Sequence, residues 1–195
     1  WKSEEKVSIK TPSRKIASDV TVIGGGAAGL STALRLQQMG VDTTIVEKED
    51  ELGGILKDIK EATQLGGQAF DSDEASTDME VLRNEIDRDN NSNETLLDIL
   101  MNHLNDTVEW EIDTLGVPFR DGFEATDTFQ QDNLKSYSSS SNRIGELLGK
   151  EAEVSGARIL FGTGVTDVQE TDDGVVVTAK GKDGSCYTIT SSYAV

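Results

Sequence analysis

The stretch VTVIGGGAAGLSTALRLQQMGVDTTIVEK, residues 20–48, constrains the fold of this chain more than any other feature. A short β-branched segment runs directly into three consecutive glycines, and an alanine-rich segment with helical spacing of its apolar residues follows. A second β-branched segment then ends at Glu47. We therefore predict a strand, a helix that stops at Gly40, and a second strand, which together form a βαβ unit of about 30 residues.

The glycines in this unit follow the spacing G-x-G-x-x-G, with Gly24, Gly26 and Gly29 at the glycine positions. In a dinucleotide-binding fold the first glycine makes a tight turn, the second lets a pyrophosphate lie against the backbone, and the third permits close packing of helix on sheet. Ala27 and Ala28 open the predicted helix. The free N–H groups and the positive dipole end of such a helix bind a diphosphate without any lysine.

Glu47 ends the second predicted strand. A dinucleotide-binding domain carries there, about 20 residues after the motif, the acid that accepts hydrogen bonds from ribose hydroxyls. A carboxylate at this position also disfavours a 2′-phosphate, so NADP is the dinucleotide that we least expect. Lys48 follows the acid and belongs to the predicted cofactor site. In this context of strand, helix, strand and acid, the glycine motif predicts dinucleotide binding.

The segment EKEDELGG, residues 47–54, resembles the extended motif of flavoproteins with a glutathione-reductase-type FAD domain. In that motif a second glycine pair, here Gly53 and Gly54, follows the ribose acid and passes along the cofactor. NAD domains lack this pair, so the resemblance implies FAD. An NAD-linked dehydrogenase would need a second nucleotide site, for which the sequence offers no motif.

Three further segments extend the resemblance along the chain. VEWEIDTLGVPF (residues 108–119) is similar to the pattern avdWLeelGvpf, GARILFGTGVTDVQETDDGVVV (156–177) is similar to a second pattern, and a later glycine pair occurs at Gly66 and Gly67. With the two glycine motifs, these segments resemble the fumarate reductase/succinate dehydrogenase flavoprotein family, which includes urocanate reductase and ketosteroid dehydrogenase relatives. The resemblance implies that the glycine pairs contact FAD and that the backbone of Val165 holds the adenine edge.

The chain departs from this family directly after the glycine pair of EKEDELGG. The family usually has Asn and Ser or Thr there, where polar side chains meet the flavin, whereas this chain has Ile55 and Leu56. Either an insertion has rearranged the flavin-facing loop or the flavin is held differently. A non-catalytic or degenerate FAD-binding module is therefore the alternative to an enzyme.

The predicted fold class is α/β, a Rossmann-like FAD-binding domain of glutathione-reductase type with added β-strands and helices. We expect residues 1–17 to form a lead-in or linker and residues 18–195 to form the N-terminal portion of the domain, truncated before the capping domain. The segment TITSSYAV (188–195) is then expected to lead into the family's next strand.

The remaining elements are predicted from periodicity and from turn residues. Asn93 is a candidate N-cap and Gly116 a terminator of one long amphipathic helix, whose apolar positions include Leu97, Leu100 and Val108. The other predicted elements are a helix at 143–155, strands in 157–162, 164–171, 174–181 and 186–195 with hairpin turns at 172–174 and 182–184, and a surface loop at SYSSSSN (136–142).

Composition excludes several classes of function. The chain has 36 acidic and 18 basic residues and a formal net charge of -18, which disfavours nucleic acid and anionic membranes as partners. No apolar run approaches the roughly 20 residues of a membrane-spanning helix. The single cysteine, Cys186, and the single histidine, His103, leave no internal disulfide and no multi-cysteine or multi-histidine metal site.

The function we predict is that of a flavin-dependent oxidoreductase acting on a small, carboxylate-type substrate by hydride transfer at flavin N5. The cofactor supplies the redox chemistry, and an electron-donor protein or domain is a possible partner. We assign no catalytic residue within the chain, because the resembled family draws its substrate-clamping Arg and His residues from other parts, and we expect the chain alone to be inactive. His103 is expected on the surface, and Trp110 and Cys186 are expected to pack.

Overall fold

The computed structural model describes residues 13–57, 62–64, 79–87, 91–116, 124–125, 135–139 and 143–195. The chain divides into two compact units, of which the first comprises Trp1–Ile55 and Leu148–Val195 and the second Leu56–Leu147. The predicted cofactor residues Gly66 and Gly67 lie outside the described residues.

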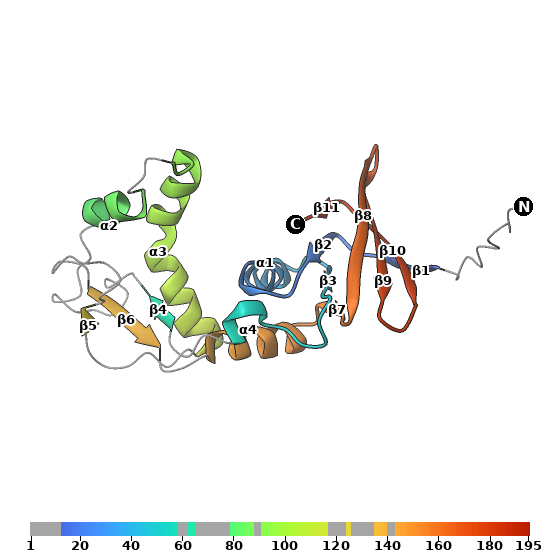
Figure 1. Cartoon of the computed structure of the whole chain (residues 1–195), viewed down its shortest axis with the longest axis horizontal. Helices are drawn as coiled ribbons and strands as arrows, with labels where there is room; N and C mark the ends of the chain where they lie inside the picture. The colour runs from blue at the N-terminus through green and yellow to red at the C-terminus, as the bar shows by residue number, and fades with distance from the viewer. Residues whose placement is uncertain are drawn as a thin grey trace, which may run out of the picture. The chain divides into compact units, whose positions relative to one another are not determined.

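The first unit is built on a parallel sheet in the order β11-β2-β3-β7 (Figure 1). Its strands are β2 (Val20–Ile23), β3 (Thr43–Val46), β7 (Arg158–Leu160) and β11 (Tyr193–Ala194). Helix α1 (Ala27–Gln38) connects β2 to β3, and these two strands pair in parallel. The predicted βαβ unit and α/β class are confirmed.

A second sheet, in the order β1-β10-β9-β8, completes this unit. It consists of β1 (Ser13–Ala17), β8 (Thr163–Thr171), β9 (Gly174–Gly181) and β10 (Cys186–Ser191). Strands β8, β9 and β10 are antiparallel neighbours, and their connections confirm both predicted hairpin turns. Strand β1 pairs in parallel with β10.

Two predictions about the ends of this unit are wrong. Ser13–Ala17, expected to belong to a lead-in, is strand β1, because it pairs with β10 and Ile16 packs against the apolar core. The segment 186–195, expected to be one strand, divides at Ser192 into β10 and β11, which lie in different sheets. Ser192 donates its N–H to the carbonyl of Asp19 over 2.9 Å, so the chain passes from one sheet to the other there.

The core of the first unit has three layers. Helix α1 buries Leu30, Ala33 and Leu34. On the antiparallel sheet, buried residues of β9 and β10 cluster with Val46 of the parallel sheet, namely Val177, Ala179 and Ile189. The parallel sheet is therefore covered on both faces, which explains why β3 is buried along its whole length.

Three fully buried threonines in the parallel sheet, Thr21, Thr43 and Thr44, place hydroxyl groups in this core. Thr21 Oγ1 lies 2.9 Å from Ser191 Oγ, and Thr43 donates its hydroxyl to the carbonyl of Val41 over 3.0 Å. Thr44 Oγ1 accepts a hydrogen bond from a guanidinium N–H of Arg158 over 3.4 Å. All three hydroxyl groups thus have a partner, as buried polar groups must if they are not to destabilise the fold.

The second unit contains α2 (Met79–Ile86) and the long helix α3 (Glu94–Leu115). Asn93 accepts a hydrogen bond from the N–H of Leu96, and Gly116 ends the helix with a left-handed φ of 59°, so both predicted caps are confirmed. Arg83 of α2 bridges to two acids at the start of α3, 2.6 Å from Glu94 and 2.7 Å from Asp98.

The remaining elements are the 3₁₀ helix η1 (Gly54–Lys57), a three-stranded sheet in the order β4-β6-β5, and α4. Their bounds are Ala62–Gln64 for β4, Glu124–Ala125 for β5, Lys135–Ser139 for β6 and Arg143–Val154 for α4. Helix α4 confirms the prediction for 143–155. The predicted loop at SYSSSSN is wrong for residues 136–139, which belong to β6 because they pair with β4 and β5.

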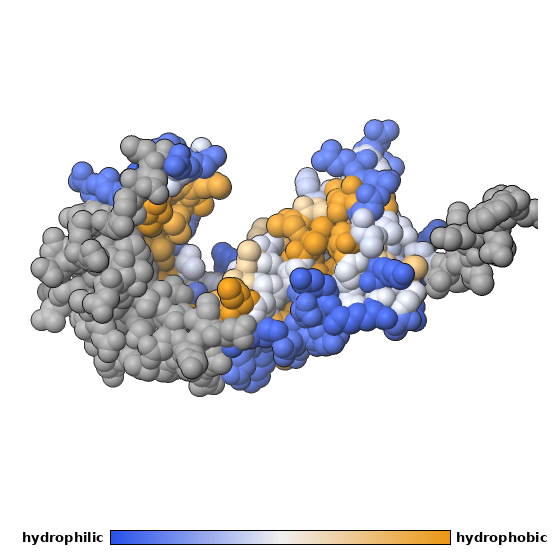
Figure 2. Space-filling model, viewed as in Figure 1, coloured by the Kyte–Doolittle hydropathy of each residue, from blue (hydrophilic) through white to orange (hydrophobic). Residues whose placement is uncertain are grey.

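Helix α3 buries one side and exposes another. Leu97 and Val108 are buried as predicted, whereas Leu100 is 44% exposed. With Leu96 and Ile99 it forms an exposed apolar face near the start of the helix, visible in orange in Figure 2. In the part of the chain that the structure describes, no helix combines the length and the apolar character that a membrane span requires.

Glu111 of α3 is a buried acid, only 8% exposed. Burial raises the pKa of its carboxyl from 4.5 to about 7. A carboxyl whose pKa is raised in the folded state binds its proton more tightly there than in the unfolded chain. Its contribution to stability is therefore greatest below pH 4.5 and is lost as the pH rises towards 7.

We predict that Glu111 lowers the free energy of unfolding of the wild type by about 3 kcal/mol as the pH rises from 4 to 8, and that Glu111→Leu abolishes this decrease. Urea unfolding monitored by circular dichroism at several pH values measures it. Glu109→Leu is the matched control, because Glu109 lies exposed on the same helix. Identical pH profiles for the wild type and both variants would contradict the prediction.

Candidate functional site

The candidate site lies where three parallel strands end. Gly24 follows β2, Glu47 follows β3, and the chain after β7 turns back beside them into Thr163. Backbone hydrogen bonds join these ends: Gly24 donates to the carbonyl of Val46 over 2.9 Å, Glu47 donates to Leu160 over 3.0 Å, and Thr163 donates to Glu47 over 2.8 Å. In open α/β sheets, ligands bind outside the carboxyl ends of the strands.

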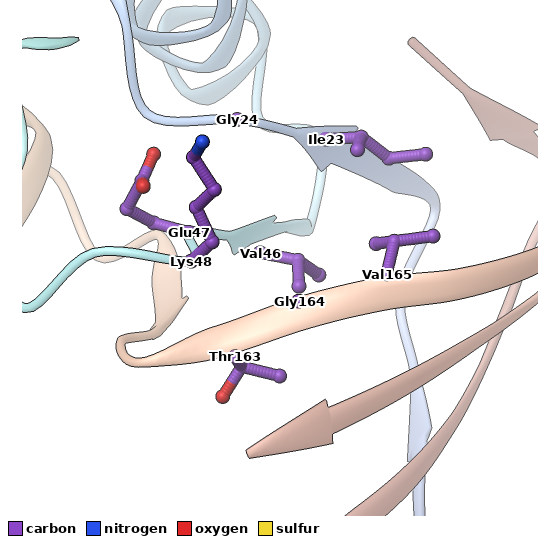
Figure 3. A pocket seen from close by; sticks show the side chains of 8 residues that line it. All are labelled: Ile23, Gly24, Val46, Glu47, Lys48, Thr163, Gly164 and Val165. Atoms are coloured by element: carbon purple, nitrogen blue, oxygen red, sulfur yellow. The ribbon is translucent and has the colours of Figure 1, made fainter. Parts of the chain in front are cut away.

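A cavity of about 290 Å³ opens at these strand ends (Figure 3). Its lining comes from the ends of β2 and β3 and from the start of β8, and consists of Ile23, Gly24, Val46, Glu47, Lys48, Thr163, Gly164 and Val165. The structure therefore brings together four of the predicted site residues, Gly24, Glu47, Lys48 and Val165, from distant parts of the sequence.

Glu47 is a buried side chain of the cavity whose carboxylate is held in place by the backbone. It is only 6% exposed, and each of its carboxylate oxygens accepts a backbone hydrogen bond. Gly25 donates its N–H to Oε2 over 2.5 Å, and Glu49 donates its N–H to Oε1 over 2.7 Å. Because a carboxylate oxygen has two acceptor positions, each can still accept a hydroxyl of a ligand.

The glycine motif makes a tight turn between β2 and α1. Gly24 has a φ of 103°, a conformation that residues with a side chain rarely adopt. A Cβ atom at Gly29 would overlap the carbonyl oxygen of Gly24, so this glycine allows α1 to approach the end of β2. By contrast, a Cβ at Gly26 would meet no atom within 4 Å.

The open space at Gly26 lies at the start of α1, since Gly26 is the N-cap of that helix. Ala27, Ala28 and Gly29 form its first turn, whose N–H groups have no partner within a helix. These donors and the positive end of the helix dipole suit an anion. The space that a side chain at Gly26 would fill is therefore available to a phosphate group.

The second glycine pair packs on the first. Gly53 donates its N–H to the carbonyl of Gly25 over 2.8 Å. A Cβ at Gly54 would lie 3.0 Å from Cα of Gly26, which leaves no room for a side chain between the two loops. The two glycine loops therefore meet through backbone atoms at these two points.

Sequence reasoning missed four lining residues, Ile23, Val46, Thr163 and Gly164. Ile23 and Val46 could have been found from the sequence, because they end the two predicted strands and residues at the carboxyl ends of parallel strands face such crevices. No local sequence pattern marks Thr163 and Gly164, since they reach the cavity only through the pairing of distant strands.

The remaining residues singled out from the sequence are not among those that line the cavity. His103 is exposed on α3 beside Asp106, as expected, and Trp110 is half-buried on the same helix. Cys186 is half-buried in β10, where its thiol donates to the carbonyl of Gly184 over 3.9 Å. Among the described residues, no group of three or more His, Cys, Asp or Glu side chains is placed to hold a metal ion.

These features fit one class of ligand. The backbone at Gly26 leaves open space at a helix N-terminus, the two fixed oxygens of Glu47 each keep an acceptor position, and the cavity beside them extends to Val165. The fold and the cavity together define a dinucleotide-binding domain of the Rossmann-like α/β type.

The particular family follows from comparison with known proteins. Residues 19–179 match the FAD binding domain family, and the chain belongs to it. FAD is therefore its cofactor, and the expected flavoprotein class is confirmed.

Curated relatives match short segments. A dihydrolipoyl dehydrogenase from Buchnera aphidicola subsp. Acyrthosiphon pisum is 34% identical over 86 residues, which cover 36% of this chain and 18% of that protein. A carotenoid 3,4-desaturase from Haloarcula japonica is 53% identical over 36 residues, which cover 18% of this chain and 7% of that protein. The chain thus matches less than a fifth of the length of either relative.

Solved structures match nearly the whole chain in fold. A flavocytochrome c3 fumarate reductase in an open conformation superposes with a TM-score of 0.76 at 18% identity, covering 92% of this chain and 33% of that one. The 3-ketosteroid-Δ4-(5α)-dehydrogenase of Rhodococcus jostii RHA1 gives 0.72 at 17% identity, covering 95% and 46%. At these identities the likeness establishes the fold.

We predict that the same substitution destabilises the protein at one glycine of the motif and not at another. Gly29→Ser should lower the free energy of unfolding by roughly 1 to 3 kcal/mol, because its Cβ would be forced against the Gly24 carbonyl. Gly26→Ser should leave it unchanged or slightly higher, because the side chain enters open space and supplies an N-cap hydroxyl. Chemical unfolding of both variants tests this pair, and equal destabilisation would contradict it.

Proposed function

We propose that the cavity and the glycine loops hold the ADP half of FAD. The single observation that carries this assignment is the carboxylate of Glu47, fixed by two backbone N–H groups at the edge of the cavity and next to the open backbone of Gly26. The residues assigned to the cofactor are Gly24, Gly26, Ala27, Ala28, Gly29, Glu47, Lys48, Gly53, Gly54 and Val165, with Gly66 and Gly67 retained from the family resemblance.

Each group has a distinct task in this proposal. The carboxylate of Glu47 accepts the ribose hydroxyls, and its charge repels a 2′-phosphate. The first turn of α1 binds the diphosphate through N–H groups, which is why an acidic chain can hold an anionic cofactor. The backbone of Val165 contacts the adenine, and the apolar side chains of Ile23 and Val46 exclude water from it.

We further propose that the protein is a flavin-dependent oxidoreductase. Bound FAD supplies hydride exchange at N5 of its flavin ring. The names of similar proteins support an oxidoreductase, since they include a fumarate reductase, dehydrogenases and a desaturase. A small carboxylate substrate is proposed from the fumarate reductase resemblance, and we assign no catalytic residue within the chain.

One observation favours a second candidate, a binding module without flavin chemistry. Ile55 directly follows the second glycine pair and is 76% exposed, where the resembled family has a polar residue facing the flavin. An apolar side chain there cannot donate or accept a hydrogen bond. Under this alternative the chain holds the ADP half of the cofactor and does no redox chemistry.

Titration of the chain with FAD and with ADP, monitored by flavin fluorescence and by calorimetry, tests the site. We predict that Gly26→Val abolishes binding of both, because its side chain fills the space assigned to the diphosphate while meeting no protein atom at Cβ. Glu47→Gln should weaken binding of both by roughly 1 to 3 kcal/mol, about the contribution of hydrogen bonds to a charged acceptor.

Circular dichroism of each variant provides the control for folding. If the folded Gly26→Val variant took up FAD as the wild type does, the glycine loop would not be the diphosphate site. FAD that binds no more tightly than ADP would mean that the flavin half makes no stabilising contact, which would favour the binding module over the oxidoreductase.

A further inference from the structure

Lys182 lies in the turn between β9 and β10, far in sequence from the glycine motif, yet its side chain reaches the segment that follows β3. Its ammonium nitrogen is 3.1 Å from Oδ2 of Asp50 and 3.7 Å from Oε2 of Glu49. These two acids come shortly after Glu47, the acid assigned to ribose. The lysine therefore ties the loop of that acid to a distant hairpin.

Backbone hydrogen bonds reinforce this tie. Lys182 donates its N–H to the carbonyl of Gly162 over 2.8 Å, and Gly162 donates its own N–H to the carbonyl of Glu49 over 2.8 Å. Gly162 has a φ of +57°, and a Cβ there would lie 3.0 Å from Oδ1 of Asp50 and 3.5 Å from Cδ of Lys182. The glycine leaves the passage through which the lysine side chain reaches the acids.

The turn that carries Lys182 is itself well braced. Asp183 accepts two hydrogen bonds from Ser185, one from its N–H over 2.9 Å and one from its hydroxyl over 2.8 Å. Gly181 donates its N–H to the carbonyl of Ser185 over 2.8 Å. Because the turn is held in one conformation, little backbone entropy is lost when the lysine forms its ion pairs.

The segment held by Lys182 is hydrogen-bonded to Glu47, the acid assigned to the ribose. Glu49 donates its backbone N–H to Oε1 of Glu47 over 2.7 Å, so the position of Glu49 sets the orientation of that carboxylate. The side chain of Glu49 also lies 3.9 Å from the ammonium of Lys48, which lines the cavity. A connected path thus runs from Lys182 through Glu49 to two residues of the site.

From this path, and resting on the FAD site proposed above, we propose that Lys182 is a positioning residue for FAD binding. It holds Glu49 and Asp50 so that the N–H of Glu49 keeps the Glu47 carboxylate aimed at the ribose. It also offsets the negative charge of two acids that adjoin the binding site of an anionic cofactor. Lys182 acts on the adenosine end, so ADP should be affected as strongly as FAD.

The test compares K182M, which keeps the length of the side chain and removes its charge, with K182R and K180M. Lys180 is exposed at the end of β9, so K180M makes the same change in net charge on the same hairpin. We expect K182M to weaken binding of both FAD and ADP about three- to tenfold, the scale of two exposed ion pairs acting together. K182R should restore affinity to within about twofold, and K180M should change it by less than about twofold.

Measuring affinity at several salt concentrations distinguishes a loss of ion pairs in K182M from a loss of fold. The difference between the wild type and K182M should shrink as salt rises from about 0.05 M to about 0.5 M, because exposed pairs are screened. In K182M, the further change Asp50→Asn should reduce the affinity for FAD and ADP little more, since the ammonium group that pairs with Asp50 is already absent. Circular dichroism confirms that each variant is folded.

Equal losses in K182M and K180M, no rescue by K182R, or a loss for FAD with none for ADP would each overturn the role of Lys182 while leaving the FAD site intact. Absence of saturable binding of FAD and ADP by the wild type would overturn the proposed site itself, and this inference with it.

Discussion

The site depends on one buried carboxylate. Removing an ionised carboxylate from water costs several kcal/mol unless it is hydrogen-bonded or paired. Glu47 meets this requirement through the N–H groups of Gly25 and Glu49, which belong to the glycine turn and to the segment after β3. The same two bonds therefore satisfy the carboxylate and help to join the two loops that form the binding surface.

Backbone atoms dominate the contact between the two glycine loops. Gly53 donates to Gly25, and Gly54 lies against Gly26, so at these two points the second loop is fitted to the first by backbone alone. An anion held by N–H groups and a helix terminus needs no basic side chain. This reconciles a net charge of -18 with an anionic cofactor and leaves lysines such as Lys182 to act on the neighbouring acids.

The sequence predicts those parts whose signals are local. The β2-α1-β3 unit, the caps Asn93 and Gly116 and the two hairpin turns all follow from residues within a few positions of each other. Strand β1 was missed because its pairing with β10 is long-range and its residues are mostly polar. The division of 186–195 into two strands was missed for a similar reason.

The residues of the candidate site likewise fall into those predicted from local sequence and those that depend on tertiary packing. The glycine spacing and Glu47 can be recognised from the sequence because each position has one specific steric or chemical requirement. Thr163, Gly164 and the contact of Lys182 with Asp50 depend on how the second sheet packs beside the first, which no periodicity records. The assignment of Gly66 and Gly67 stays a prediction, since both lie outside the described residues.

The buried threonines of the parallel sheet have a consequence for strand alignment. A slip of β2 by one residue would place a valine where Thr21 now meets Ser191, and would turn the threonine hydroxyl towards apolar neighbours. A buried hydroxyl without a partner costs about 1 to 3 kcal/mol, whereas a purely aliphatic strand would slide with a smaller penalty. Hydroxyl groups in the core thus specify a single register, and that register keeps the ends of β2 and β3 level, so that Gly24 and Glu47 emerge side by side.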